Sequence, residues 1–232
     1  MMHLHAFSVV YEDNHLLVVN KQSGIPSQSD LTGDPALTDY VKNYLKEKYN
    51  KPGNIFCGLV HRLDRPVSGL MVLAKTSKAL TRMNEIFRSR QVQKTYLAVS
   101  HCQPQPTGGK LIHWLTKNAK TNVTRAHLQE VKNSDRAELD YRLVATWGDK
   151  SLLEVHPITG RGHQIRVQLA SIGCPIWGDV KYGSTVKDST GCIGLHAYQI
   201  SFEHPVQKRM VTFSAEPPFE RPVWKVFQSI IG

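Results

Sequence analysis

Apolar and polar positions alternate in short blocks along this chain, and strand-like and helix-like periods follow one another without a regular order. Two apolar runs at 7–11 and 16–20 flank the polar residues 12–14, a pattern that predicts a β-hairpin. Residues 70–74 form a short, uninterrupted apolar run. Such a run is typical of a strand covered on both faces.

Two segments in the first half have helical spacing. Asp34 followed by Pro35 predicts an N-cap and a first helical position for a helix over 36–48. A second helix is predicted after a cap at Thr76 or Ser77. Its apolar stripe consists of Leu80, Met83 and Phe87.

The second half is predicted to be mainly β-structure. The expected strands are 96–100, 111–115, 137–146 and 151–157, followed by a hairpin of 197–203 with 210–214. One helix is expected over 163–171, ended by Gly173, and another over 223–230, opened by Pro222. Without internal repeats or an evident linker, we expect one α+β domain over 1–232 with a mixed, largely antiparallel sheet and flanking helices.

The charge balance indicates an anionic partner. The chain has 232 residues, of which 41% are hydrophobic, enough for a folded core. Its 29 Lys and Arg exceed 19 Asp and Glu, which gives a net charge of +10. Such an excess is typical of proteins that bind nucleic acid or an anionic membrane. Part of it is concentrated at Lys78, Arg82, Arg88, Arg90 and Lys94.

Several other classes are disfavoured. The cysteines are scattered, and their spacing predicts neither a disulfide framework nor a zinc site. They are Cys57, Cys102, Cys174 and Cys192. His3 and His5 lack metal-ligand spacing, and no dinucleotide or phosphate-cradling loop is present. No run approaches the ~18 apolar residues of a membrane span, and no signal peptide is visible. We therefore expect a cytoplasmic protein with no metal, cofactor or membrane contact.

The most informative segment is 61–75, where a single carboxylate, Asp64, lies among basic side chains. Those side chains are His61, Arg62 and Arg65. Pro66 predicts a tight turn, after which Gly69 leads into the apolar run. A carboxylate on a turn at the start of a buried strand is well placed for chemistry on a polyanion.

This segment resembles the core motif of the RluA-type RNA pseudouridine synthases, which reads His-Arg-Leu-Asp, two variable residues, Thr-Ser-Gly, an apolar strand and Ala-Lys. Val67 stands where this motif usually has a threonine. In the later arginine motif, Gly162 likewise stands where a threonine is commoner. The further likenesses, in the family's order, are Lys94-Thr95-Tyr96, the arginine motif 159–170, the segment 175–183 and Leu195-His196-Ala197. The resemblance covers about residues 7–215.

The resemblance implies the same α+β fold, with an active-site cleft across the sheet. It implies isomerisation of uridine to pseudouridine in ribosomal or transfer RNA by a monomer without a cofactor. Asp64 is implied as the catalytic residue, and the sequence leaves open whether it attacks C1′ or assists elimination to a glycal. Arg166 is implied as its partner, because a close cation keeps a buried carboxylate ionised.

The resemblance also places Tyr96 against the target uracil, where its hydroxyl can take the proton from C5, and Leu195 as an apolar wall. A stacked uridine must be flipped out, so Arg62 or His61 is expected to fill the vacated space. The other expected RNA contacts are Arg65, Arg161, His163 and Gln164. Gly160 and Gly162 either let the backbone approach RNA or only shape the turn before the helix.

Two alternatives make different predictions. A non-catalytic RNA-binding or ribosome-assembly factor on this fold would show a damaged Asp64, Tyr96 or Arg166, and all three are intact. A hydrolase would need a second carboxylate or metal ligands beside Asp64. Asp179 is implied to be structural. Many relatives carry an RNA-binding domain before the catalytic one, and we expect none here because the family pattern begins by residue 7.

Overall fold

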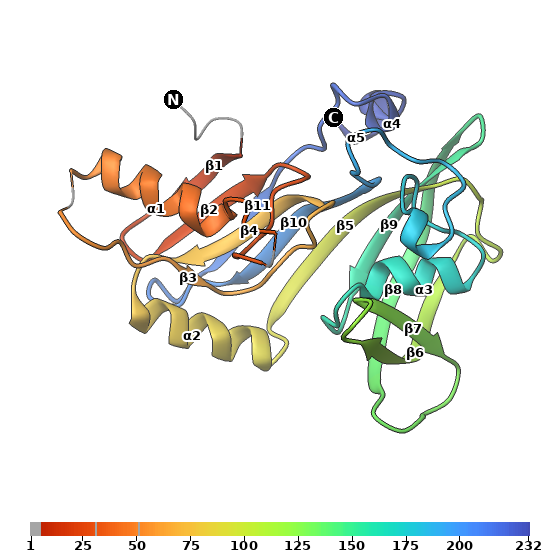
Figure 1. Ribbon diagram of the computed structural model, residues 1–232, viewed down its shortest axis with the longest axis horizontal. Helices are drawn as coiled ribbons and strands as arrows, with labels where there is room; N and C mark the ends of the chain where they lie inside the picture. The colour runs from red at the N-terminus through yellow and green to blue at the C-terminus, as the bar shows by residue number, and fades with distance from the viewer. Residues whose placement is uncertain (1–5, 31, 51) are drawn as a thin grey trace. The chain divides into compact units, whose positions relative to one another are not determined.

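The computed structural model describes residues 6–30, 32–50 and 52–232 (Figure 1). The chain divides into two compact units, unit 1 with residues 1–93 and 197–215, and unit 2 with residues 94–196 and 216–232. Within the described residues, eleven strands belong to one sheet. The predicted α+β class with a mixed, largely antiparallel sheet is confirmed. The expectation of a single domain over 1–232 stays a prediction.

Unit 1 is built on a buried central strand. Its strands are β1 (Phe7–Glu12), β2 (Leu16–Lys21), β3 (Gly58–Leu59), β4 (Ser68–Ala74), β10 (Leu195–Glu203, of which 197–203 belong here) and β11 (Met210–Ser214). They follow the order β1-β2-β4-β10, with β3 paired to β4 and β11 to β10. Every residue of β4 is buried, as its apolar run predicts. Both predicted hairpins are confirmed, since β1 pairs with β2 and β10 with β11, each antiparallel.

The helices of unit 1 are α1 (Leu37–Lys48) and α2 (Ser77–Arg88). The predicted cap at Asp34 is wrong, because the N-cap is Ala36, whose backbone N–H donates to Oδ2 of Asp39 over 3.0 Å. Asp34 instead forms an ion pair with Arg65 at 2.6 Å. The prediction at Thr76 is confirmed, since its hydroxyl oxygen accepts a hydrogen bond from the third residue of α2. The predicted stripe packs on the core with Met83 fully buried.

Unit 2 contains a long antiparallel array. Its strands are β5 (Val92–Ser100), β6 (Gly108–Asn118), β7 (Val123–His127), β8 (Asp135–Trp147) and β9 (Lys150–Pro157), in the order β5-β9-β8-β6-β7. Each of the four predicted strands is present and extends beyond its apolar segment, because antiparallel neighbours also pair the polar ends. The short strands β3 and β7 were not predicted.

The helical segments of unit 2 are α3 (Gln164–Ser171), the 3₁₀ turn η2 (Val180–Tyr182), α4 (Pro222–Lys225) and α5 (Gln228–Ile231). The helix expected from 163 begins one residue later, with His163 left-handed at a φ of 59°. A single terminal helix over 223–230 is wrong. The backbone N–H of Phe227 bonds to the carbonyl of Trp224, and this tight turn between α4 and α5 buries both rings completely. No described helix is long and apolar enough to cross a membrane.

Candidate active site

The turn that carries Asp64 is fixed by its own hydrogen bond and by the strand that follows. The backbone N–H of Val67 donates to the carbonyl of Asp64 over 3.0 Å, and β4 begins at the next residue. Gly69 then has a φ of +117°, and a Cβ there would lie 2.4 Å from the carbonyl oxygen of Ala197. Only glycine fits at this position. The entry into β4, shortly after the turn that carries Asp64, is therefore sterically determined.

A buried lysine and a buried serine hold this turn from unit 1. The ammonium of Lys21, a fully buried residue, donates to the carbonyls of Gln22 at 2.9 Å, Ile25 at 2.8 Å and Arg65 at 3.5 Å. The hydroxyl of Ser27 donates to the carbonyl of Leu63 at 2.6 Å and accepts from its N–H at 3.1 Å. Sequence reasoning missed both residues.

One signal could have revealed Lys21. It follows Leu17 and Val19 at a spacing of two in β2. Alternate strand residues share a face, and both leucine and valine here are fully buried. A lysine that continues a buried face needs acceptors for its ammonium, since burying a charge without partners is costly.

The basic residues around Asp64 have different environments. Nε2 of His61 accepts a hydrogen bond from the backbone N–H of Val72 at 3.0 Å, and its ring stacks on Phe87 at 4.9 Å between centroids. Arg65 is exposed and tied to the loop before α1 by its ion pair. Arg62 is exposed and makes no hydrogen bond or ion pair with another residue in the described part of the chain. Of the three, Arg62 is best placed to meet an incoming ligand.

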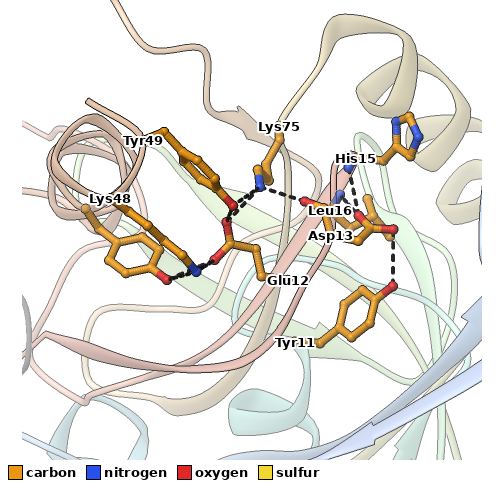
Figure 2. A network of polar contacts seen from close by, with 9 residues as sticks. Tyr11, Glu12, Asp13, His15, Leu16, Lys48, Tyr49 and Lys75 are labelled. Carbon is orange, nitrogen blue, oxygen red and sulfur yellow. Dashed lines mark hydrogen bonds and ion pairs between the residues drawn. The ribbon is translucent and has the colours of Figure 1, made fainter. Parts of the chain in front are cut away.

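The far end of β4 is tied down by Glu12, at the end of β1 (Figure 2). Its carboxylate accepts from Lys75 and Lys48, each at 2.7 Å, and from the hydroxyls of Tyr49 at 2.6 Å and Tyr44 at 2.8 Å. Burial alone raises the pKa of Glu12, but these four donors outweigh it and lower the pKa to about 2. Lys75, the last residue of the motif segment, is thereby engaged in the protein interior.

In unit 2, Tyr96 and Lys94 lie two residues apart in β5 and therefore share a face of the strand. Both are partly buried. Burial lowers the pKa of the Lys94 ammonium. Leu195, the first residue of β10, is 3% exposed and has the environment of a core residue. The structure thus places an aromatic hydroxyl and a partly desolvated cation side by side on one face.

Arg166 is buried in α3 and held by a carboxylate. Its Nε lies 2.7 Å from Oδ2 of Asp179 and its Nη2 lies 2.8 Å from Oδ1, a bidentate pair with side chains 6% and 2% exposed. Its guanidinium carbon lies 5.0 Å from the centre of the Tyr182 ring, whose hydroxyl is 2.6 Å from Nδ1 of His163. Asp179 and Tyr182 were not predicted as site residues. The pairing of Arg166 with Asp64 stays a prediction.

The loop between β9 and α3 is organised by Gln164, which is 4% exposed. Its side-chain oxygen accepts from the hydroxyl of Thr159 at 2.7 Å and the N–H of Arg161 at 3.0 Å, while its nitrogen donates to the carbonyl of Glu138 at 2.9 Å. The guanidinium of Arg161 lies 3.4 Å from the carboxylate of Asp135. Gln164 thus shapes the loop that presents Arg161.

No group of three or more His, Cys, Asp or Glu side chains in the described ranges is placed to hold a metal ion. His3 and His5 lie outside those ranges. In the basic run after the Asp64 segment, Arg82 donates to the carbonyl of Pro205 at 3.3 Å and Arg88 pairs with Glu85. This run is thus partly engaged within unit 1.

The sequence matches one family model, described as RNA pseudouridylate synthase, over residues 15–171. A ribosomal large subunit pseudouridine synthase D from Zymomonas mobilis is 32% identical, covering 90% of this chain and 69% of the relative. A ribosomal large subunit pseudouridine synthase C from Vibrio parahaemolyticus is also 32% identical, covering 94% and 67%. Similarity therefore extends over most of this chain.

Solved structures agree with the sequence comparison. Human RNA pseudouridylate synthase domain containing 4 superposes with a TM-score of 0.76 at 25% identity, covering 94% of this chain and 91% of that one. Human RNA pseudouridylate synthase domain containing 1 gives a TM-score of 0.72 at 26% identity, covering 92% and 84%. The arrangement of strands and helices described above is therefore one that solved pseudouridylate synthase domains share.

Proposed function

The chain belongs to the RNA pseudouridylate synthase family, and on this premise we propose that it modifies large-subunit ribosomal RNA with Asp64 as its catalytic residue. Membership confirms the RluA-type resemblance, so the chain is an RNA pseudouridine synthase, an isomerase that acts on RNA. Membership favours an active isomerase over the non-catalytic and hydrolytic alternatives. The names of the Zymomonas and Vibrio relatives support ribosomal RNA as the substrate.

The observation that carries the role of Asp64 is the clamp beneath its turn. Lys21 and Ser27 hold the backbone on both sides of it, so the turn that carries the carboxylate has a defined position before β4. In the reaction, the N1–C1′ bond breaks, C5 bonds to C1′, the proton on C5 leaves and N1 gains a proton. Because uracil leaves as a delocalised anion, one positioned carboxylate is sufficient.

Two residues of unit 2 complete the proposed chemistry. Tyr96 stacks on the uracil, and its hydroxyl removes the proton from C5 once the new bond has formed. Arg166 keeps Asp64 ionised, while Asp179 fixes the plane of its guanidinium. A bidentate carboxylate holds an arginine in one orientation, which a lysine would not reproduce. The buried Arg166–Asp179 pair supports this role, because it shows that the guanidinium is preorganised in unit 2.

The remaining predicted residues divide by exposure. Arg62 is proposed to fill the space left by the flipped uridine, at a cost of unstacking of a few kcal/mol. Arg65, Arg161 and His163 are proposed to contact the RNA backbone. Their neighbours His61 and Gln164 position these elements from within the protein. Leu195 is proposed as the apolar wall of the uracil site.

Release of tritium from RNA labelled at C5 of uridine tests this function. We expect release from protein-free large-subunit ribosomal RNA, and none with Asp64→Asn. Small-subunit ribosomal RNA and transfer RNA are the comparison substrates, and faster release from either would overturn the proposed substrate. We further propose a cytoplasmic monomer folding as one domain, and sedimentation of the free protein as a dimer would contradict the monomer.

A further inference from the structure

Two glycines before α3 are not required by the fold of the protein itself. Neither Gly160 nor Gly162 has a φ in the left-handed region. A Cβ at Gly160 would meet only the ammonium nitrogen of Lys94, at 3.8 Å, and one at Gly162 only that of Lys117, at 3.7 Å. Both distances are ordinary contacts, so alanine fits at either position. Glycine where nothing internal demands it leaves room for the backbone to approach a ligand.

The two lysines beside these glycines are not neutralised by the protein. Within the described residues, the ammonium group of neither Lys94 nor Lys117 makes a hydrogen bond or ion pair. Burial lowers the pKa of Lys94, and no carboxylate offsets that effect. A partly desolvated cation without an internal partner is unfavourable in the free protein. An anion that arrives with the substrate would supply the missing partner.

The loop beside these two lysines is organised by hydrogen bonds and presents donors. The side chain of Gln164 fixes Arg161, and the hydroxyl of Thr124 donates to the carbonyl of Gly162 at 3.0 Å. The backbone N–H groups of Gly160 and Gly162 donate to no other described residue. The N–H of Arg161 between them is bound by Gln164, so the two glycines supply the donors beside the two cations. Backbone N–H groups and cations together form a favourable environment for anions.

We propose that this loop, together with Lys94 and Lys117, binds a phosphate of the RNA strand that carries the target uridine. The inference extends the proposed function, because it adds a backbone-binding site to the catalytic residues. Lys94 and Tyr96 share a face of β5, so the bound phosphate lies next to the site proposed for the uracil. The site therefore positions the strand for catalysis.

The salt dependence of RNA binding tests the lysines. Lys94→Met and Lys117→Met should each lower the slope of log affinity against log salt by about 0.7, the value for one phosphate on single-stranded nucleic acid. Lys110→Met is the matched control, since Lys110 lies in β6 with Lys117 but faces Asp140 at 3.9 Å. Its slope should not change. Because Lys94 has no internal partner, Lys94→Met should keep or raise the melting temperature, whereas a structural lysine would lower it.

The glycines are tested by adding one methyl group. Gly160→Ala should leave the melting temperature unchanged and weaken RNA binding several-fold, because its Cβ occupies the space in front of Lys94. Gly109→Ala is the control, since a Cβ at this β6 glycine meets nothing within 4 Å. It should bind RNA as the wild type does. Unchanged affinity of Gly160→Ala would overturn the proposal, as would a lower melting temperature, which would assign the glycine to the turn.

Failure of this inference differs from failure of the proposed function. If the wild type releases tritium from ribosomal RNA but Lys94→Met retains the full salt slope, only the phosphate site is refuted. If Lys94→Met keeps its affinity and slope but loses turnover, Lys94 acts in proton transfer instead. If the wild type released no tritium from ribosomal RNA, the proposed substrate would be refuted. The salt dependence of RNA binding by the lysine variants would still test the phosphate site.

Discussion

The Asp64 turn and the Arg166 helix each carry a motif residue, but they hold it in opposite ways. In the turn, a buried ammonium and a hydroxyl fix the backbone, and the nearby Arg62 is exposed. In the helix, the side chain itself is fixed by Asp179 and buried. In the turn, the hydrogen bonds of Lys21 and Ser27 are made to the backbone. A buried ion pair makes the side chain part of the core.

This difference separates activity from stability. A substitution of Asp64 leaves the hydrogen bonds of Lys21 and Ser27 in place, because they are made to the backbone of the neighbouring residues. Replacing one member of a buried pair leaves an uncompensated charge, which costs about 3–5 kcal/mol. The two regions are therefore distinguished by measuring turnover and unfolding on the same variants, from the largest expected effect to the smallest.

The largest effect is expected from Asp64→Asn. Turnover should fall below detection, because the amide can neither attack C1′ nor accept a sugar proton. The melting temperature should fall far less than that of Arg166→Met, since the backbone hydrogen bonds that hold the turn remain. RNA affinity should change by no more than several-fold, because phosphate contacts dominate it. Measurable turnover on the true substrate would exclude this residue as the catalyst.

Tyr96→Phe should give the next largest effect. The ring is kept, so binding and flipping should survive, while loss of the hydroxyl slows proton removal from C5 by about 10²–10⁴-fold. Tritium release from C5-labelled uridine is the direct measurement. Wild-type release would show that Tyr96 only stacks. Tyr198→Phe, at a partly buried tyrosine of β10, is the control and should keep wild-type release.

Arg166→Met should reduce both turnover and stability, in contrast to Asp64→Asn. It leaves Asp179 buried without its partner, and the free energy of unfolding should fall by about 3–5 kcal/mol. Arg166→Lys should retain only part of that stability, because a lysine lacks the planar guanidinium fork. Denaturant unfolding measures the stability. The double variant Arg166→Met with Asp179→Asn should recover stability but not turnover, and full recovery of turnover would contradict the catalytic role.

How much of this could be read from the sequence also differs between the regions. The strand after Asp64 and the helix containing Arg166 were predicted, because apolar runs and local motifs determine them. Lys21 was missed, because it acts on a turn far from it in sequence and a lysine outside a motif is usually a surface residue. Asp179 was implied to be structural, but its bidentate pair with Arg166 was not predicted.

The errors at element ends have a similar origin. Asp34 has the right chemistry for an N-cap, but the structure pairs it with Arg65 and gives the N–H of Ala36 to Asp39. The expected terminal helix is broken because the core takes the rings of Trp224 and Phe227. The Asp34–Arg65 pair and the burial of the two rings are tertiary contacts that outweigh the local preference, whereas the cap from Asp39 lies only three residues from Ala36.

Lys21→Met tests whether the backbone clamp in unit 1 matters. It leaves the carbonyls of Gln22, Ile25 and Arg65 without their shared donor, and hydrogen bonds to a charged group contribute about 1.5–3 kcal/mol. Stability should fall by that order, and turnover should fall because the Asp64 turn loosens. Lys46→Met, at an exposed position of α1, is the control and should change neither. If Lys21→Met lost stability but kept full turnover, the contacts of Lys21 would not contribute to catalysis.

The smallest effect is expected at the other end of β4, where Glu12 holds Lys75. Its folded pKa of about 2 lies below the ordinary 4.5, so its contribution to stability is present above pH 4.5 and is lost as pH falls towards 2. Glu12→Gln should therefore melt below the wild type at neutral pH, with the difference shrinking over that interval. Glu203→Gln, in an exposed ion pair 3.5 Å from Lys208, should show little difference at any pH. A constant gap between Glu12→Gln and the wild type down to pH 2 would mean that packing, rather than charge, ties β4 to β1.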